Sequence, residues 1–139
     1  MATQQQQRSN YGTMIEDLDA IAAAIQLYIA GVTQGDAASL AEAFHPGAQM
    51  YGAIGDKRLD MPISEFSKHV TPADVDGTYR ARITSIMQDG DVAGAVLIEE
   101  NYLGTLSFTD FFTLSRLEGR WRIVTKTFAH TGGEMPAPQ

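Results

Sequence analysis

The chain has 139 residues, with 17 acidic and 10 basic side chains and a formal net charge of −7 at pH 7. This length predicts one domain with its own buried core, while the negative charge and the scattered basic residues speak against a nucleic-acid partner. No cysteine is present, which excludes disulfides and thiolate chemistry, and no apolar run approaches the roughly 18 residues of a membrane span, so we expect no membrane partner.

The first ten residues, MATQQQQRSN, are polar and lack the apolar segment of a secretory signal. We therefore expect a cytoplasmic protein in which residues 1–11 form a disordered polar tail. A single domain should cover residues 12–131, and residues 132–139 should form a flexible C-terminal tail.

The first ordered element should be a helix. Apolar residues recur at alternating spacings of four and three over residues 14–32, the pattern of a helix with one buried face. Thr13 and Glu16 have the spacing of a capping box at its start. Gly35 predicts its end, because glycine readily adopts the left-handed conformation that terminates helices.

Shorter elements should follow. Asp36 has the character of an N-cap, which predicts a second helix that runs to about Phe44. Residues 48–61 resemble a short hairpin, and a third short helix is expected after Pro62. The segment 71–78 is polar and should be a loop.

Beyond this loop the apolar pattern changes to a period of two, which predicts strands. Asp89-Gly90 and Glu118-Gly119 are typical of tight hairpin turns, and the connection near residues 104–105 is also short. Short links require antiparallel neighbours, so the strands should form a meander, and helices followed by such a sheet are the α+β pattern. The predicted strands cover residues 79–88, 92–103, 106–117 and 121–130.

Three segments carry a family resemblance: YIAGVTQGDAASLAEAFHPGAQMYG at 28–52, ISEF at 63–66 and FTDFFTLSRLEGRWRIVTKTFAH at 108–130. With them the chain resembles the nuclear transport factor two superfamily, and most closely its branch called putative lumazine-binding or SnoaL-like. The resemblance implies an α+β fold of the cystatin-like or NTF2-like type, a cone-shaped bent antiparallel β-sheet wrapped around about three N-terminal helices. It also implies a cavity at the open end of the cone.

The same resemblance implies much less about chemistry. The superfamily includes steroid isomerases, polyketide cyclases, dehydratases and transport factors, and a fold does not fix the reaction. Such cones work with one or two polar side chains in an apolar cavity, where desolvation can raise a carboxyl pKa enough for general acid or base catalysis. Ionisable residues among apolar strand neighbours are therefore the candidates.

Asp110 is the leading candidate. In the segment FTDFF, the side chains of Phe108, Asp110 and Phe112 should share one face of a strand. A carboxylate between two aromatic rings needs a partner or a function. Lys126, in IVTKTF, has similar surroundings, so the two residues form either a structural ion pair or part of a ligand-binding or catalytic site.

Whether Asp110 and Lys126 meet depends on the turn between their strands. If Gly119 occupies a left-handed bulge position after a type I turn, Asp110 lies directly opposite Lys126. A plain two-residue turn instead moves Lys126 to the other face. We favour the bulge, because Glu118 is an unusual first residue for a type I′ turn.

Other candidates carry a structural alternative. His130 could be a base at the mouth of the cavity or a terminal strand residue, and Tyr28 could point its hydroxyl into the cavity or be a core tyrosine. The three histidines lack metal-ligand spacing, so we expect no metal site. The candidate catalytic residues are Asp110, Lys126 and His130, and the candidate ligand-binding residues are Tyr28, Tyr51, Phe108, Phe112 and Phe128.

Three functions remain open. The first is a small-molecule binding domain with an apolar cavity and an unidentified organic ligand. The second is a small acid/base enzyme of the isomerase, cyclase or dehydratase type that needs no cofactor. The third is a dimeric interaction module, and in any of these cases we expect a homodimer through the sheet, whose outer face the helices leave uncovered. An unpaired buried carboxylate would favour the enzyme, and one locked to Lys126 would favour binding.

Overall fold

The computed structural model describes residues 14–137. The predicted polar tail at 1–11 and the capping-box residue Thr13 lie outside the described residues. Of the predicted C-terminal tail, residues 133–137 have no regular secondary structure, whereas Gly132 still belongs to the last strand.

The predicted first helix is present as α2 (Met14–Gln34), and its buried face lies on the expected spacing, with Ile21, Ile25, Tyr28 and Val32. Helix α3 (Ala37–Ala43) follows, and the carboxylate of its N-cap residue accepts hydrogen bonds from two backbone amides of the first turn. Gly35 joins the two helices with φ of +67°.

The second helix is one residue shorter than expected, because Phe44 has extended backbone angles and begins β1 (Phe44–Ile54). The hairpin expected at 48–61 is present, with β1 antiparallel to two short strands, β2 (Lys57–Arg58) and β3 (Met61–Pro62). The third helix, α4 (Ile63–Lys68), follows directly.

The predicted meander is confirmed. Each of its strands pairs antiparallel with the next along the chain. The sheet order is β2-β1-β7-β6-β5-β4, and the β1–β7 pair is parallel; no short link joins these two strands, so nothing forces them to be antiparallel. The strand bounds are β4 (Arg80–Asp89), β5 (Val92–Tyr102), β6 (Leu106–Leu117) and β7 (Arg120–Gly132).

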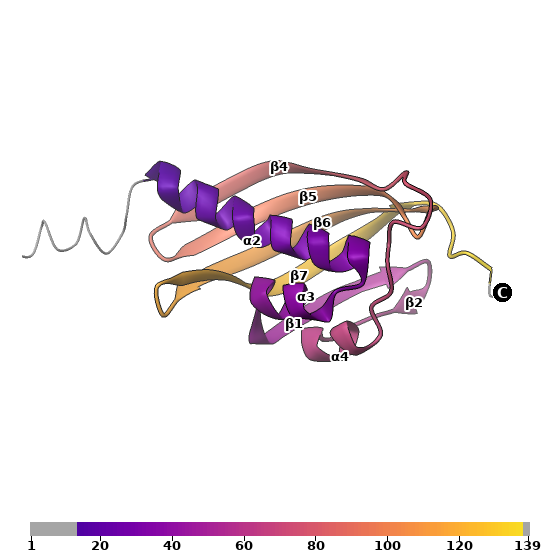
Figure 1. Cartoon of the computed structure of the whole chain (residues 1–139), viewed down its shortest axis with the longest axis horizontal. Helices are drawn as coiled ribbons and strands as arrows, with labels where there is room; N and C mark the ends of the chain where they lie inside the picture. The colour runs from indigo at the N-terminus through magenta and orange to yellow at the C-terminus, as the bar shows by residue number, and fades with distance from the viewer. Residues whose placement is uncertain (1–13, 138–139) are drawn as a thin grey trace, which may run out of the picture.

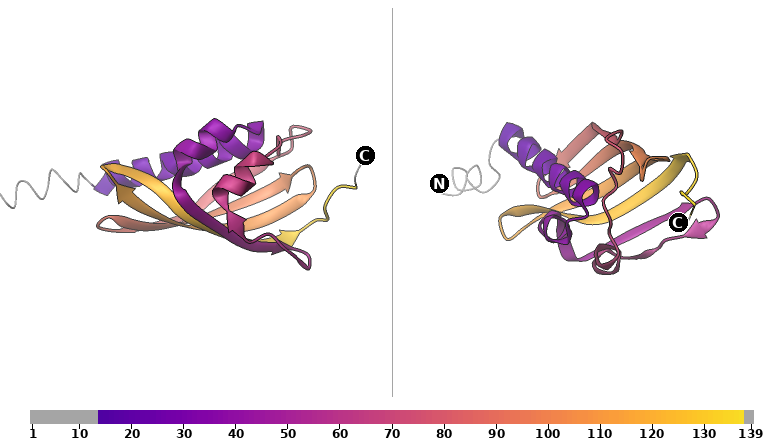
Figure 2. Two further views of the ribbon diagram at one scale, coloured as in Figure 1. Left: turned by 90° about the horizontal axis from the view of Figure 1, so that it is seen from below. Right: turned by 45° about the vertical axis from the view of Figure 1, so that its right-hand side comes forward.

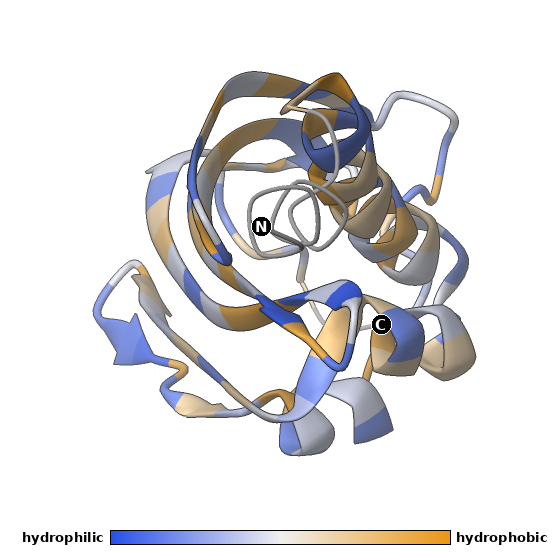
Figure 3. Ribbon diagram, turned by 90° about the vertical axis from the view of Figure 1, so that its left-hand side faces the viewer, coloured by the Kyte–Doolittle hydropathy of each residue, from blue (hydrophilic) through white to orange (hydrophobic). Residues whose placement is uncertain are grey.

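Helices α2, α3 and α4 lie on one side of the bent sheet (Figure 1, Figure 2). Hydrophobic and hydrophilic residues alternate along the strands (Figure 3), as expected when successive side chains face opposite sides. The core lies between α2 and the inner face of the sheet and includes Tyr28, Leu97 and Phe112. This is the expected α+β cone. Among residues 14–137, no helix combines the length and apolarity that a membrane crossing requires.

Candidate functional site

The hairpin of β6 and β7 differs from the predicted one at its turn. Glu118 and Gly119 both have positive φ, 54° and 77°, and the residues that flank them pair directly, as in a two-residue type I′ turn. The bulge that we favoured at this turn is absent. The prediction that Asp110 lies directly opposite Lys126 is therefore wrong.

A bulge is present further along the same strands. The register shifts by one residue between positions 113 and 114 of β6, which leaves Val124 of β7 without a partner in the ladder. This shift returns Lys126 to the inner face, which it shares with Asp110. Asp110 pairs directly with Phe128, so Lys126 is its diagonal neighbour across the two strands.

Asp110 and Glu99 are two fully buried carboxyl groups, each 0% exposed. They lie on the neighbouring strands β6 and β5, offset by two residues along the ladder, which makes them diagonal neighbours on the inner face. Two tyrosine hydroxyls hold Glu99: Tyr28 donates to its Oε1 at 3.2 Å, and Tyr79 donates to its Oε2 at 2.5 Å.

Asp110 is held less closely, because neither of its oxygens makes a well-formed hydrogen bond within residues 14–137, although Glu99 and Tyr28 lie near enough to interact with its carboxyl group. Burial first, and then the negative charge of Glu99, raise the pKa of Asp110 well above its usual range, while the ammonium of Lys126 opposes the rise. Burial, followed by the charges of Asp110 and Glu99, likewise raises the pKa of Tyr28. A carboxyl group with a raised pKa is suited to proton transfer near neutral pH.

Lys126 is 6% exposed and faces aromatic rings. Its Nζ lies 4.9 Å from the ring centroid of Tyr28, 5.1 Å from that of Phe128 and 5.3 Å from that of Phe66. No ion pair joins it to any carboxylate of residues 14–137. Of the two alternatives for Asp110 and Lys126, the structural ion pair is thus not formed, and the register places the two residues diagonally rather than directly opposite each other.

A cavity of about 60 Å³ opens beside Lys126. Its lining includes Tyr102, at the end of β5, and Phe108, near the start of β6, so it lies at the end of the sheet where these two strands connect. The tip of β1, helix α4 and strands β5, β6 and β7 all contribute to its wall, with Ile54, Phe66, Tyr102, Phe108, Lys126 and Phe128.

The aromatic wall depends on a close approach between β1 and β7. The rings of Phe108 and Phe128 meet edge to face, with centroids 5.5 Å apart. A Cβ at Gly52 would come within 2.5 Å of the Phe128 ring, so glycine leaves the space that this ring needs. Asp110 does not line the cavity, since it lies deeper in the sheet beside these two rings.

The other predicted site residues lie in different places. Phe112 packs in the core against Tyr28, with ring centroids 5.2 Å apart. Tyr51 is 44% exposed because it alternates with the inward-facing residues of β1, so it does not reach the cavity. Both ring nitrogens of His130 are engaged: Nδ1 accepts from the Gly55 amide at 3.1 Å, and Nε2 donates to a backbone oxygen at 2.6 Å.

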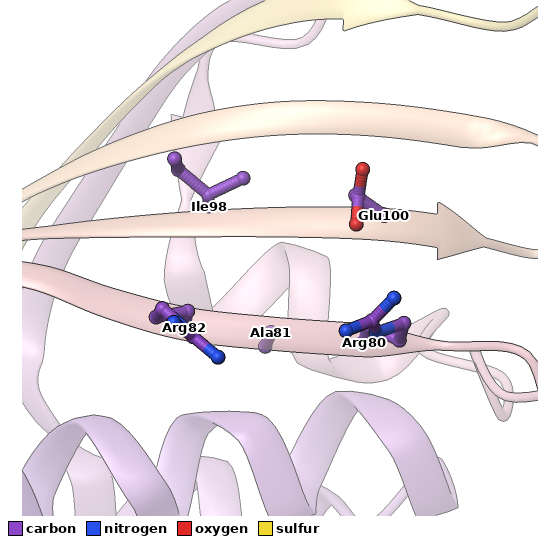
Figure 4. Close-up of a pocket in the computed structure, with 5 residues that line it drawn as sticks. All are labelled: Arg80, Ala81, Arg82, Ile98 and Glu100. Carbon is purple, nitrogen blue, oxygen red and sulfur yellow. The ribbon is translucent and has the colours of Figure 1, made fainter.

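Larger hollows lie on the outer face of the sheet, away from the buried carboxyls. One of about 400 Å³ runs along β4 and β5, where Arg80 and Arg82 lie beside Ile98 and Glu100 (Figure 4). It offers two cations and a carboxylate on an open surface. Within residues 14–137, no group of three side chains is arranged to hold a metal ion.

The sequence contained a partial signal for Glu99. The adjacent Glu99 and Glu100 necessarily put one carboxylate on each face of their strand, but which one faced inward depended on the register. The contribution of Tyr79 had no signal in the sequence, since this residue lies at the junction of a loop and β4.

Comparison with known proteins assigns the chain to a family. The family described as "Putative lumazine-binding" matches residues 16–129, which include every element of the site. The chain belongs to this family. The resemblance to the nuclear transport factor two superfamily is thereby confirmed.

Solved structures agree. The chain is 30% identical to an NTF2-like protein of unknown function from Methylobacillus flagellatus, with a TM-score of 0.78 over 87% of this chain and 97% of that one. It is 26% identical to another NTF2-like protein of unknown function, from Shewanella baltica, with a TM-score of 0.77 over 86% and 98% of the two chains. Among characterised proteins, it is 23% identical to the aldolase FrzH of Cladobotryum sp. over 112 residues, which cover 81% of this chain and 90% of the relative.

Proposed function

We propose that the chain is a small acid/base enzyme that uses its own side chains to move a proton on a small organic molecule, with Asp110 as the proton-transferring group. One observation carries the proposal: the Asp110 carboxyl is fully buried beside the Glu99 carboxyl, and neither of its oxygens makes a well-formed hydrogen bond within the described residues. A carboxyl that stabilised the fold would be hydrogen-bonded or ion-paired. The raised pKa of Asp110 instead suits its carboxyl group to take up and release a proton.

The chemistry that suits this arrangement is deprotonation of carbon next to a carbonyl group. The reaction starts from the ionised form of Asp110, whose raised pKa makes it a strong base. Its carboxylate accepts the proton, the C–H electron pair moves toward the carbonyl oxygen, and the resulting enolate carries the negative charge. The ammonium of Lys126, on the same face, stabilises that charge. Return of the proton to a different carbon completes an isomerisation.

Glu99 has a different part in this scheme. Its two oxygens accept hydrogen bonds from Tyr28 and Tyr79, which fix it as a charge beside Asp110. Its field raises the pKa of Asp110 and so makes Asp110 a stronger base. Aldol reactions also begin with an enolate, and the aldolase name of the Cladobotryum relative is compatible with this class.

Hydrogen exchange tests the proposal without knowledge of the natural substrate. The protein is incubated in D₂O with small ketones such as acetophenone, cyclohexenone and 2-tetralone, and loss of the α-proton signal is followed by ¹H NMR. We expect accelerated exchange with at least one ketone. Asp110→Asn should abolish the acceleration, whereas Asp56→Asn, at an exposed residue of the β1–β2 turn, should retain it.

A second function has one observation in its favour. The cavity reaches Lys126 but not Asp110, so catalysis requires the Phe108 or Phe128 ring to move when a ligand enters. If no ketone exchanges faster than in buffer, or if Asp110→Asn exchanges like the wild type, the chain is better described as a small-molecule binding domain. The same NMR samples distinguish the two functions, because ligand signals broaden on binding without loss of the α-proton.

A further inference from the structure

The cavity beside Lys126 combines a cation with an apolar, aromatic wall. Four of its six wall residues are aromatic, one is aliphatic and one is Lys126. With a volume of about 60 Å³, against about 30 Å³ for one water molecule in the liquid, the cavity admits the head of a ligand rather than a whole one. The rest of such a ligand would lie among the aromatic rings at the mouth.

Lys126 is unusual because its charge is buried without an anionic partner in direct contact. A buried, unpaired ammonium loses several kcal/mol of hydration free energy. The cation–π interaction with each aromatic face stabilises it by only about 0.5–2 kcal/mol. The carboxyl group of Asp110 interacts with Lys126 electrostatically, without an ion pair. An anion that pairs directly with this ammonium would therefore have to lie in the cavity.

We propose that this cavity is an anion subsite, in which the ammonium of Lys126 binds the carboxylate or enolate oxygen of a small aromatic or unsaturated organic acid. The flat body of the acid packs against Phe66, Phe108 and Phe128. This assignment names the ligand class of the site and rests on the proposed function only in that both use the same cavity. It does not require that Asp110 transfer a proton.

The charges around the cavity are compatible with an incoming anion. The titratable groups around Lys126 are the Asp110 carboxyl, Tyr28 and Tyr102, and behind them lie Glu99 and Tyr79. Burial raises the pKa of each of the three tyrosines, so they stay neutral. The pKa of Asp110 is also raised, so this carboxyl tends to keep its proton. With one of the two carboxyls protonated, the single charge of the other balances Lys126, and the cluster as a whole does not repel an anion.

Three probes of nearly equal size test the subsite: benzoate, which is an anion, benzamide, which is neutral, and benzylamine, which is a cation. Their affinities are measured by calorimetry, and the site is located by ¹H–¹⁵N chemical-shift changes. We expect benzoate to bind at least about tenfold more tightly than benzamide, a difference of about 1.4 kcal/mol, and benzylamine not to bind. The largest shifts should occur at the amides of residues 66, 108 and 126–128.

Variants assign the preference to Lys126. Lys126→Met, which keeps the length of the side chain without its charge, should remove the difference between benzoate and benzamide. Lys68→Gln is the matched control, because this lysine is exposed on α4 and pairs with Glu65, and it should leave the difference unchanged. If Lys126→Met does not fold, the comparison of the three probes on the wild-type protein still decides.

The subsite is overturned if benzoate does not bind, if benzamide binds equally well, if the shifts map to the outer face of the sheet, or if Lys126→Met retains the preference. Asp110→Asn separates this proposal from the proposed function. That variant loses a negative neighbour and should bind benzoate at least as tightly as the wild type, even though it loses ketone exchange. Exchange without benzoate preference would refute the subsite alone, and benzoate preference without exchange would refute the catalytic proposal alone.

Discussion

At the scale of the residue, Asp110 is set apart by what it lacks. A buried carboxylate normally accepts two or more hydrogen bonds or pairs with a cation, as Asp60 does on the surface with Arg58 and the Gly52 amide. Asp110 makes no well-formed hydrogen bond within residues 14–137 and is completely buried. Its charged form therefore costs stability, and its presence calls for a role other than holding the fold.

Asp110→Asn follows from this argument. Asparagine has nearly the same shape and no charge, so the melting temperature should stay level or rise by a few degrees, about 1 kcal/mol. A structural ion pair with Lys126 would give the opposite, a loss of about 3–5 kcal/mol. Thermal unfolding followed by circular dichroism measures the change, with Asp56→Asn as the exposed control.

The pH dependence of stability gives an independent check. The pKa of Asp110 is raised in the folded state, so its contribution to stability is fully present below the unfolded pKa of about 3.9 and is lost as pH rises through the folded value. The wild type should therefore lose stability relative to Asp110→Asn between about pH 4 and neutral pH. Urea unfolding of both proteins across this range measures the difference, and a constant difference would show that the carboxyl does not titrate abnormally.

At the scale of the element, the β6–β7 hairpin shows which part of the site could be predicted. The period of two correctly assigned Asp110 to the face of Phe108 and Phe112, since alternation needs no knowledge of the partner strand. That Lys126 shares this face was expected through a bulge at Gly119. The bulge instead lies at Val124, where the sequence carries no glycine or other sign of it.

Contacts between neighbouring strands could not be predicted from the sequence, for the same reason. The register between β5 and β6 makes Asp110 a diagonal neighbour of Glu99, whose negative charge acts on it. Local composition does not specify such a register. Tyr51 was expected in the cavity as an aromatic strand residue, but the register of β1 turns it to the solvent. The fold could be predicted because periodicity and turn signals are local. Of the site, only the residues that share a face within one strand could be predicted, because contacts between strands depend on their register.

The turn of this hairpin offers a test of its geometry. Glu118 has φ of 54°, a left-handed conformation that glutamate adopts at a cost. Asparagine is favoured before glycine in type I′ turns, so Glu118→Asn should increase the free energy of unfolding by about 0.5–1 kcal/mol. Chemical denaturation measures this gain, with Glu42→Asn on α3 as a control that should not stabilise. A loss of stability at position 118 would contradict the type I′ assignment.

At the scale of the whole molecule, the helices within residues 14–137 leave one face of the sheet uncovered (Figure 2). Helices α2, α3 and α4 all lie on the inner side (Figure 2), and the outer face exposes large apolar side chains. Phe111 is 54% exposed near the centre of the sheet, and Ile98 is 42% exposed on the next strand. Exposed apolar side chains gathered on one face mark an interaction surface.

We propose that a second copy of the chain covers this face, as the sequence led us to expect. A symmetric sheet-to-sheet contact places Phe111 near its own symmetry mate and needs about 800 Å² from each partner to be stable. Light scattering at micromolar concentration should then give about twice the 15.1 kDa of one chain.

Phe111→Lys should reduce the mass to that of one chain, because it puts two like charges together at the centre of the contact. Val75→Lys, at an apolar residue that is equally exposed but lies in the loop before β4, should leave the dimer intact. A wild-type mass near that of one chain, or a dimer that survives Phe111→Lys, would exclude assembly through this face.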